Sequence, residues 1–462
     1  MAEQSSSVLA MLTEFFSAEQ IEATARRTGF VRRTSKITGK LFLALVTFGG
    51  WSDATTTLAQ LVAKATQFGG QVAVSPEALY QRMNKRALAF LQEMIRIALA
   101  KLQACEQHCD ASLFAPFARV HIADSTGFGL PESLKDTFPG AGGSAAQAGA
   151  KIQLVWDYKH SVFTHFALTP WNIPDQKYID TVVALATRYD LFLFDLGYFK
   201  IKALAKIAAA HAYFVCRLNH QATLLEAVAD RVAPVELAGR LAAVEHALLE
   251  QPILIGTKEQ VAARLIAARV PEDVVNARRR AARKTAKKKG YTPSHAHLTL
   301  LAWSLFITNV PETIWQTPTV LKVYPIRWQI ELIFKSWKSY LHLASLKTTK
   351  ENPTLCYLYG RMLLILLNYA LCPQIRAALW EKKQREVSVL KLVRHFQAFA
   401  ERWMQVIFQS AFELRRFLQQ VCATAERLVG KALRKRRTTA QLLRESVQNQ
   451  RETVVFMEAV SA

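Results

Sequence analysis

The chain has 462 residues, of which 51% are hydrophobic, so it is long enough to bury a large core in about two to four domains. Its formal charge of +23 indicates a polyanionic partner, either nucleic acid or an anionic membrane surface. The most apolar stretch, near residues 362–372, is bounded by Arg361 and Pro373 and is too short to cross a bilayer.

The N-terminus lacks the basic region and the cleavage site of a signal peptide, which predicts a cytoplasmic protein. The six cysteines are widely spread, so reduced thiols are expected. Cys105, His108 and Cys109 have no second ligand pair at zinc-site spacing, and structural zinc is therefore not expected.

Residues 1–115 are predicted to be helical, because apolar positions recur at intervals of three and four. Within them, SPEALYQRMNKR at 75–86 has the capped start and basic end of a recognition helix. A helical module with clustered cations is a candidate for reading DNA ends in the major groove, and a solvated helical surface is the alternative. The clustered cations of this module, which lie near one turn, are Arg26, Arg27, Arg32, Arg33, Lys36 and Lys40.

From residue 116 the pattern changes to short strands. FARVHIA at 117–123 predicts a strand that delivers Asp124. Residues 151–158 and 161–169 predict two more strands of an antiparallel meander, with Asp157 in the turn between them.

The segment LFLF at 191–194 predicts a short buried strand between Asp190 and Asp195. Asp195 leaves the C-terminal end of this strand, where open sheets place their sites, so we prefer it over Asp190. A further strand is predicted at 212–218, and Arg217 near its end is a candidate for DNA contact.

Between residues 219 and 296 the rhythm is interrupted. Residues 253–256 and 261–270 predict strands of an insertion, and RRRAARKTAKKK at 278–289 then places eight cations in twelve positions. Such runs are most often solvated, but this one precedes the last expected core strand, which favours contact with a nucleic-acid backbone. Its cations are Arg278, Arg279, Arg280, Arg283, Lys284, Lys287, Lys288 and Lys289.

Residues 298–308 predict a buried strand, and the segment YPIRWQIELIFKSWK at 324–338 predicts a helix that begins near Pro325. On that helix Arg327, Glu331 and Lys338 fall within roughly 60° of one another. A carboxylate flanked by cations in an otherwise apolar helix suits a divalent metal beside phosphates, and a solvated charged stripe is the alternative.

The spacing of four polar residues resembles the signature helix of the DDE transposases of bacterial insertion sequences, of the family-four type. Two further segments resemble the acidic segments of that family: ADSTGFGLP around Asp124, and the Asp-x-Gly-Tyr pattern at Asp195. The four signature residues are Tyr324, Arg327, Glu331 and Lys338.

The resemblance implies an α/β fold: a ribonuclease-H-like catalytic core with a β-rich insertion, plus helical N- and C-terminal regions. The implied order is a DNA-end-binding domain at 1–115, the core at 116–218 and 297–375, the insertion at 219–296, and a helical region for oligomerisation or DNA contact at 376–462.

In this resemblance Asp124, Asp195 and Glu331 are the catalytic, metal-binding residues. Two Mg²⁺ ions, which Mn²⁺ can replace, would relieve the repulsion among three carboxylates. The remaining signature residues, Tyr324, Arg327 and Lys338, would hold DNA phosphates.

Trp303 aligns with a tryptophan that stacks where a base is flipped out, in relatives that cut DNA through a hairpin. A plain core tryptophan is the alternative for Trp303.

The implied reaction is metal-dependent cleavage of double-stranded DNA at inverted-repeat ends, through hairpin ends, and strand transfer into target DNA. We expect a homodimer in the synaptic complex. We also expect a bacterial cytoplasmic protein that is associated with the nucleoid and not with a membrane. The alternatives are a nuclease of the same fold, a catalytically silent DNA-binding regulator derived from a transposase, and a basic peripheral membrane protein, for which no amphipathic anchor is visible.

Overall fold

The computed structural model describes residues 2–53, 56–68, 74–104, 112–142, 146–228, 231–343, 345 and 348–432. Its architecture is mixed α/β, as expected. The chain forms two compact units, and each is assembled from separate parts of the sequence. The first unit contains the N-terminal helices, the segment Ser125–Ile173 and the chain from Gln329 to the last helix. The second contains the start of the first strand, up to Asp124, and the segment Pro174–Trp328.

The N-terminal region is helical, as its apolar spacing predicts. Side chains of Ser17, Thr38 and Ser75 cap three of its helices by accepting hydrogen bonds from backbone N–H groups of the first turn. The helices are α1 (Ala2–Phe15), α2 (Ala18–Arg27), α3 (Gly39–Phe48), α4 (Leu58–Phe68), α5 (Pro76–Arg82) and α6 (Lys85–Ala104). Cys105, His108 and Cys109 lie outside the described residues.

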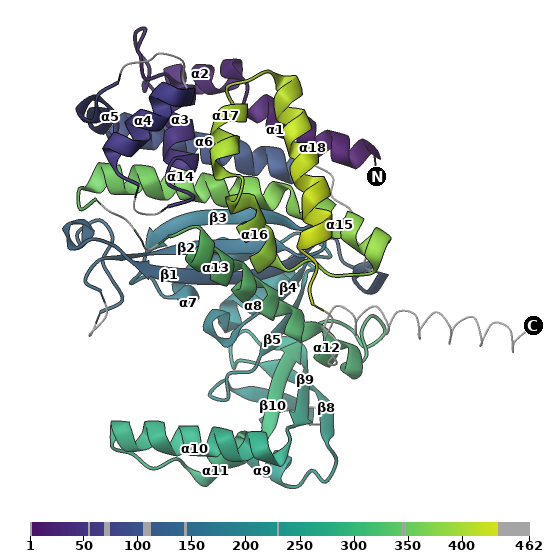
Figure 1. Ribbon diagram of the computed structural model, residues 1–462. Helices are drawn as coiled ribbons and strands as arrows, with labels where there is room; N and C mark the ends of the chain where they lie inside the picture. The colour runs from purple at the N-terminus through teal and green to yellow at the C-terminus, as the bar shows by residue number, and fades with distance from the viewer. Residues whose placement is uncertain are drawn as a thin grey trace, which may run out of the picture. The chain divides into compact units, whose positions relative to one another are not determined.

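The long apolar helix α14 (Glu351–Ala370) is central to the first unit. It packs against α3 and α6 on one side (Figure 1). The centroid of its Tyr369 ring lies 4.3 Å from the centroid of the Phe163 ring in β3 (Val162–Pro170). Gly360 permits the approach to α3, because a Cβ there would collide with the Val46 carbonyl oxygen. The stretch Glu351–Lys383 has the length and hydropathy of a membrane span, but 83% of its apolar window is buried inside the protein. This stretch is therefore part of the protein core.

The C-terminal region is also helical. Its helices are α15 (Cys372–Lys383), α16 (Val389–Gln397), α17 (Ala400–Val406) and α18 (Ala411–Leu428). They pack into the first unit, since α18 contacts α1 and α15 while α17 contacts α3. The basic stretch ALRKRR, 432–437, lies almost wholly outside the described residues.

The first unit contains three strands in the order β3-β2-β1: β1 (Val120–Gly129), β2 (Gly149–Asp157) and β3 (Val162–Pro170). β2 and β3 are antiparallel, as predicted. The predicted place of Asp157 in their turn was wrong, because Asp157 is the last residue of β2 and pairs with Val162. Its carboxylate accepts hydrogen bonds from the backbone N–H groups of Lys159 and His160, which follow in the turn. The predicted extent of β1 was wrong. The strand continues past Asp124 to Gly129, because its second half pairs in this unit.

In the second unit the strand order is β1-β4-β5-β10-β9-β8-β6-β7. β1, β4 and β5 are parallel, whereas the later strands are antiparallel, so the predicted insertion extends the same sheet. The strands are β4 (Leu191–Phe194), β5 (Tyr213–Arg217), β6 (Leu224–Val228), β7 (Arg231–Pro234), β8 (Leu248–Ile255), β9 (Val261–Arg269) and β10 (Trp303–Thr308).

The helices of this unit are α7 (Asp175–Val183), α8 (Ile201–Ala209), α9 (Leu237–Ala242), α10 (Glu272–Lys289), α11 (His295–Leu300) and α12 (Thr317–Val323). The strand predicted at 298–308 was half wrong, because α11 reaches Leu300 and β10 begins at Trp303. Ser294 caps α11 by accepting from the His297 N–H, and a continuous apolar run fits a helix and a buried strand equally well.

The helix predicted to begin at Pro325 has a different start. α12 already precedes it, the 3₁₀ turn η4 (Tyr324–Trp328) contains Pro325, and α13 (Gln329–Tyr340) begins only afterwards. The prediction that Arg327, Glu331 and Lys338 share one helix face was therefore wrong for Arg327. This residue lies in the 3₁₀ turn, which has a different number of residues per turn from the α-helix.

Candidate active site

Two aspartates follow the paired parts of neighbouring parallel strands in the second unit. β1 and β4 pair with Ile122 opposite Leu193, and Asp124 and Asp195 each stand two residues later. Equal distances from a paired position put two side chains level with each other and on the same face of a parallel sheet. The register therefore brings two carboxylates side by side.

Asp190, at the other end of β4, has structural partners. Its side chain is fully buried, Arg119 donates to its carboxylate from Nε at 2.9 Å and from Nη2 at 2.6 Å, and His121 Nε2 lies 3.4 Å away. Burial raises the pKa of Asp190, but hydrogen bonds from His121 and Arg119 outweigh burial and hold this pKa well below its usual range. Asp190 forms an internal ion pair, which leaves Asp195 as the candidate for chemistry.

Tyr324, in η4, is directed into the protein. Its hydroxyl donates a hydrogen bond to the Phe194 carbonyl oxygen at 3.1 Å, and its ring packs edge-on against Phe306 with 4.9 Å between the centroids. The residue is 9% exposed, and burial raises the pKa of its phenol above the usual range. The phosphate contact predicted for Tyr324 would require the hydroxyl to leave this bond.

Arg327, in the same turn, lies beside the first aspartate. Its Nη1 is 3.6 Å from Asp124 Oδ2, and the two side chains are 12% and 21% exposed. At this distance the contact is an ion pair rather than a short hydrogen bond. A guanidinium here offsets the repulsion between two adjacent carboxylates.

Glu331 and Lys338 lie on α13 and belong to the first unit. Glu331 is half-buried in the first turn of the helix, and Lys338 is exposed in its last turn. Seven residues of an α-helix make nearly two full turns, so both side chains fall on one face of α13. The gathering of Glu331 with Asp124 and Asp195 stays a prediction.

The two aspartates have the chemistry of a site for a hard divalent cation. Mg²⁺ is commonly bound by one or two carboxylates together with water and substrate phosphates. The donor set of Asp124 and Asp195 fits that description. Among the residues that the structure describes, no group of three His, Cys, Asp or Glu side chains is close enough to hold a metal ion.

Trp303 is the first residue of β10 and is 4% exposed. The guanidinium of Arg269 lies over its ring, 4.9 Å from the centroid. These are the surroundings of a core tryptophan, and stacking on a flipped base would require Arg269 to move.

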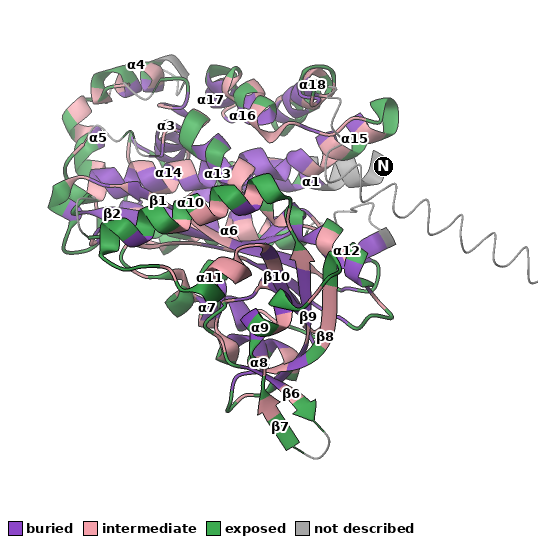
Figure 2. Cartoon of the chain, turned by 90° about the horizontal axis from the view of Figure 1, so that it is seen from below, coloured by how far each residue is buried: buried purple, intermediate pink, exposed green. Residues whose placement is uncertain are grey.

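The basic run is a helix with two different sides. Val275 and Ala286 are its buried residues, while its cations stand largely on the exposed surface of α10 (Figure 2). At about 100° per residue, five of these cations lie within about 140° of one another, on the side away from the buried residues. The five are Arg280, Arg283, Lys284, Lys287 and Lys288.

Two arginines of α10 hold the helix in place. Arg278 donates to the Trp303 carbonyl oxygen at 3.0 Å and to Ser304 Oγ at 3.1 Å, and Arg279 donates to the Leu298 carbonyl oxygen at 3.3 Å. Burial and the neighbouring charge of Arg217 lower the pKa of Arg278. Arg278 and Arg279 therefore support the fold, a role that the sequence reasoning missed because their partners lie on separate elements.

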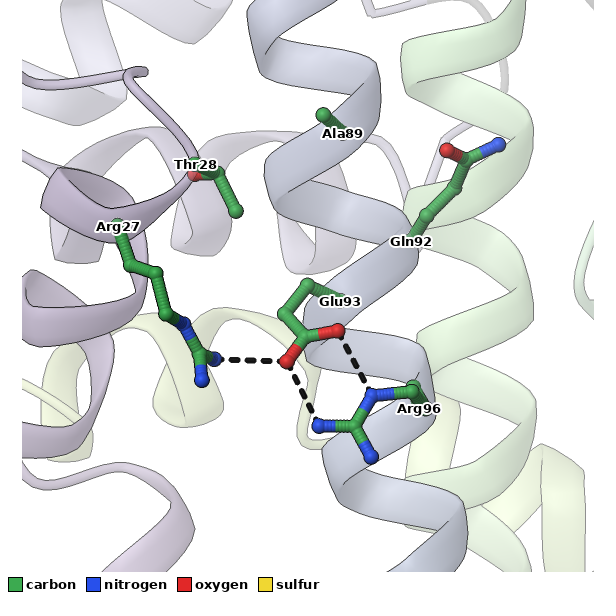
Figure 3. A pocket seen from close by; sticks show the side chains of 6 residues that line it. All are labelled: Arg27, Thr28, Ala89, Gln92, Glu93 and Arg96. Atoms are coloured by element: carbon green, nitrogen blue, oxygen red, sulfur yellow. Dashed lines mark hydrogen bonds and ion pairs between the residues drawn. The ribbon is translucent and has the colours of Figure 1, made fainter.

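A cationic pocket lies among the N-terminal helices of the first unit. Arg27 Nη2 lies 2.7 Å from Glu93 Oε1, and Arg96 donates to both oxygens of the same carboxylate (Figure 3). One carboxylate thus neutralises only one of two cations. The pocket is lined by Arg27, Thr28, Ala89, Gln92, Glu93 and Arg96.

The predicted recognition helix is short. α5 covers only Pro76–Arg82, and Arg82 donates to the Phe30 carbonyl oxygen at 2.8 Å while it lies over the Phe30 ring. Arg82 is thereby engaged within the protein, and DNA reading by this region stays a prediction.

Comparison with known proteins bears on the two acidic strands. The family described as Transposase DDE domain matches residues 115–367, more than half of the chain. The chain belongs to this family. The match to the DDE domain includes all three predicted acids and the whole of η4.

Curated relatives carry related names. The transposase for insertion sequence element IS1151 of Clostridium perfringens is 29% identical over 446 residues, which cover 93% of this chain and 94% of that protein. The transposase for IS231B of Bacillus thuringiensis subsp. berliner is 28% identical over 414 residues, 86% of each chain. The transposase for IS421 of Escherichia coli is 22% identical over 362 residues, 77% of this chain and 91% of that protein.

Proposed function

We propose that this chain is a cut-and-paste transposase that cleaves double-stranded DNA at the inverted-repeat ends of an insertion sequence and joins the freed ends to target DNA. The observation that carries the proposal is the pair Asp124 and Asp195, in a chain of the DDE domain family. Each aspartate stands two residues after a paired position, Ile122 opposite Leu193, of the parallel strands β1 and β4. Relatives named as insertion-sequence transposases align over most of both chains, which supports the same reaction class.

We assign the third carboxylate to Glu331. It follows Arg327 by four residues, and Arg327 is already ion-paired with Asp124. The order of parallel strands that precedes it supports a ribonuclease-H-like core, and the spacing of Tyr324 to Lys338 supports the family-four type.

Two bound Mg²⁺ ions would activate the attacking water or DNA 3′-hydroxyl and would stabilise the departing 3′-oxygen. The chain's own part is to hold the ions through Asp124, Asp195 and Glu331 and to orient the DNA. Arg327 and Lys338 are suited to non-bridging phosphate oxygens, because charge-assisted hydrogen bonds to phosphate are strong. No side chain needs to act as a nucleophile, so a protein–DNA covalent intermediate is not part of the proposal.

The cationic side of α10 would follow the DNA backbone, and two protomers would bring two DNA ends together. Cleavage through hairpin ends is part of the same proposal.

An assay with two labelled inverted-repeat ends and a supercoiled target plasmid tests this function. With Mg²⁺, the wild-type chain should cut the ends, form hairpins and insert them, and Asp195→Asn should lose all three products. Cutting without insertion would identify a nuclease. DNA binding without any cutting would identify a silent regulator and would overturn the proposal.

A further inference from the structure

Two helices of the first unit form the walls of the cationic pocket (Figure 3). α2 ends at Arg27, and α6 packs against α2 and carries the other charged residues. Gln92 is held away from the charged groups, because its Nε2 donates to the Tyr359 hydroxyl of α14 at 2.7 Å. Thr28 and Ala89 have short side chains. The pocket has a volume of about 490 Å³, which leaves room for a phosphate group beside the charges.

The charges of the pocket are arranged with the cations outermost. The side chains of Arg27 and Arg96 are 60% and 65% exposed, whereas that of Glu93 is 21% exposed. Both arginines reach the same carboxylate, because the Nη2 atom of each lies 2.7 Å from Glu93 Oε1. An anion that approaches from the solvent therefore meets two guanidinium groups before it meets the carboxylate.

Neither guanidinium uses all of its donors on Glu93. Arg27 donates only through Nη2, and Arg96 donates through Nε and Nη2, so Nε and Nη1 of Arg27 and Nη1 of Arg96 form no hydrogen bond with any residue that the structure describes. A guanidinium presents its N–H groups in a planar fork that matches carboxylate and phosphate alike. The hydrogen bond from Arg96 lowers the pKa of Glu93. This carboxylate is therefore ionised at neutral pH and occupies donors that a phosphate would use.

The cations continue along α6, which favours a polymeric anion over a single small one. Lys85 and Arg86 are exposed in the first turn of this helix. At about 100° per residue, Arg86 and Glu93 lie within about 20° of each other, and a rise of about 1.5 Å per residue separates them by roughly 10 Å. DNA presents phosphates at regular intervals along its backbone, and the chain belongs to the transposase DDE domain family. A DNA backbone therefore fits this row of cations.

We propose that Arg27 and Arg96 bind a backbone phosphate of DNA, and that Glu93 fills this phosphate site in the free protein and limits its affinity for DNA. The inference rests on the proposed function, because that function makes DNA the partner. Contacts to phosphate add affinity but carry no sequence information, so the pocket should act in the same way on any duplex.

The test is Glu93→Gln, which keeps the size of the side chain and removes its negative charge. Affinity is measured on the full chain in EDTA, by fluorescence anisotropy, with an inverted-repeat duplex and with a duplex of the same length and scrambled sequence. Removal of the competing carboxylate should tighten the binding of both duplexes by about five-fold. Arg27→Gln should weaken the binding of both by a similar factor, and it should reduce the slope of log affinity against log salt by about 1.

Glu426→Gln is the matched control in the same unit. Glu426 accepts from Lys382 Nζ at 2.6 Å, and the two side chains are 20% and 59% exposed, close to the values of Glu93 and Arg27. This variant makes the same change in net charge outside the pocket, so it should change DNA affinity by less than about two-fold. Thermal melts should shift little and alike for Glu93→Gln and Glu426→Gln, because both variants break exposed ion pairs.

A double change of the arginines shows whether Glu93 acts through them. In an Arg27→Gln/Arg96→Gln background the phosphate site is absent, so Glu93→Gln should no longer tighten DNA binding. A gain that persists in this background would come from net charge alone and would overturn the proposal.

The remaining outcomes separate the phosphate site from the proposed function. If the folded wild-type chain binds neither duplex, the proposed function fails and this site fails with it. If the chain binds them but Glu93→Gln gains no more affinity than Glu426→Gln, the phosphate site is overturned and the proposed function stands. A loss by Arg27→Gln that is confined to the inverted-repeat duplex would also overturn the site, in favour of base recognition.

Discussion

The two acidic side chains at opposite ends of β4 have different surroundings. Asp190 is fully buried with Arg119 and His121, whereas Asp195 is half-buried and level with Asp124. The sequence located both acids correctly, since a run of four apolar residues ends at each of them. It could not reveal Arg119 as the partner of Asp190, because that contact joins distant parts of the chain.

Asp190→Asn should destabilise the second unit by about 2–3 kcal/mol at pH 7, because it removes the buried partner of Arg119. The pKa of Asp190 is lowered on folding. The ionised carboxylate therefore contributes its full share to the free energy of unfolding above the unfolded carboxyl pKa of about 4, and this share is lost as the pH falls through the lower folded pKa. Urea unfolding of both proteins from pH 7 to pH 3 should show the difference shrinking on acidification.

Asp180 gives the matched control for that measurement. It is paired with Lys200 and Lys206, and its hydrogen bond to Lys200, followed by that to Lys206, lowers its pKa to about 2. Because its side chain is 44% exposed, Asp180→Asn should leave the urea midpoint at pH 7 almost unchanged. Equal destabilisation by both variants would contradict the distinction between buried and exposed pairs.

Arg327 should weaken divalent-cation binding in the absence of DNA. Arg327→Gln removes a positive charge 3.6 Å from Asp124, so Mn²⁺ should bind the DNA-free variant several-fold more tightly. Titration of the DNA-free chain with Mn²⁺, followed by electron paramagnetic resonance of free Mn²⁺, measures the change. Weaker Mn²⁺ binding by folded Arg327→Gln would show that the guanidinium orders the site rather than competing with the cation.

At the scale of elements, the sequence predicted strands well where apolar runs have clear polar ends. It failed where a long apolar run contains a helix and a strand, as at 298–308, because periodicity does not separate the two. It also placed a helix start at Pro325, although α12 and η4 precede α13. A proline fits a 3₁₀ turn as readily as the first turn of an α-helix, so composition alone did not decide.

The two sides of α10 should respond differently to mutation. The triple change Lys284→Gln, Lys287→Gln and Lys288→Gln removes exposed like charges, so it should reduce the slope of log affinity against log salt for DNA by roughly 2–3 and leave the melting temperature unchanged. A fluorescence-anisotropy titration at several salt concentrations measures the slope.

Arg278→Gln is the structural counterpart on the same helix. It breaks the hydrogen bonds to Trp303 and Ser304, so it should lower the melting temperature while the salt slope changes little. If the triple variant instead has the wild-type salt slope, the exposed side of α10 does not contact DNA.

For the whole molecule, the order of acidic segments along the sequence indicated the family before any contact was known. The three-dimensional part of the site was less predictable, since the Tyr324 bond to Phe194 depends on where a 3₁₀ turn meets a strand far away in the chain. Asp124 and Asp195 lie in the second unit and Glu331 in the first. We propose that these three acids share divalent cations.

Crystals of the full chain soaked in Mn²⁺ give the most direct test, because anomalous scattering locates the ion independently of any activity. The account predicts anomalous peaks within coordination distance of carboxylate oxygens of Asp124, Asp195 and Glu331, and their loss in Asp195→Asn. Mn²⁺ bound elsewhere, with the carboxylate of Glu331 directed away from the two aspartates, would contradict it.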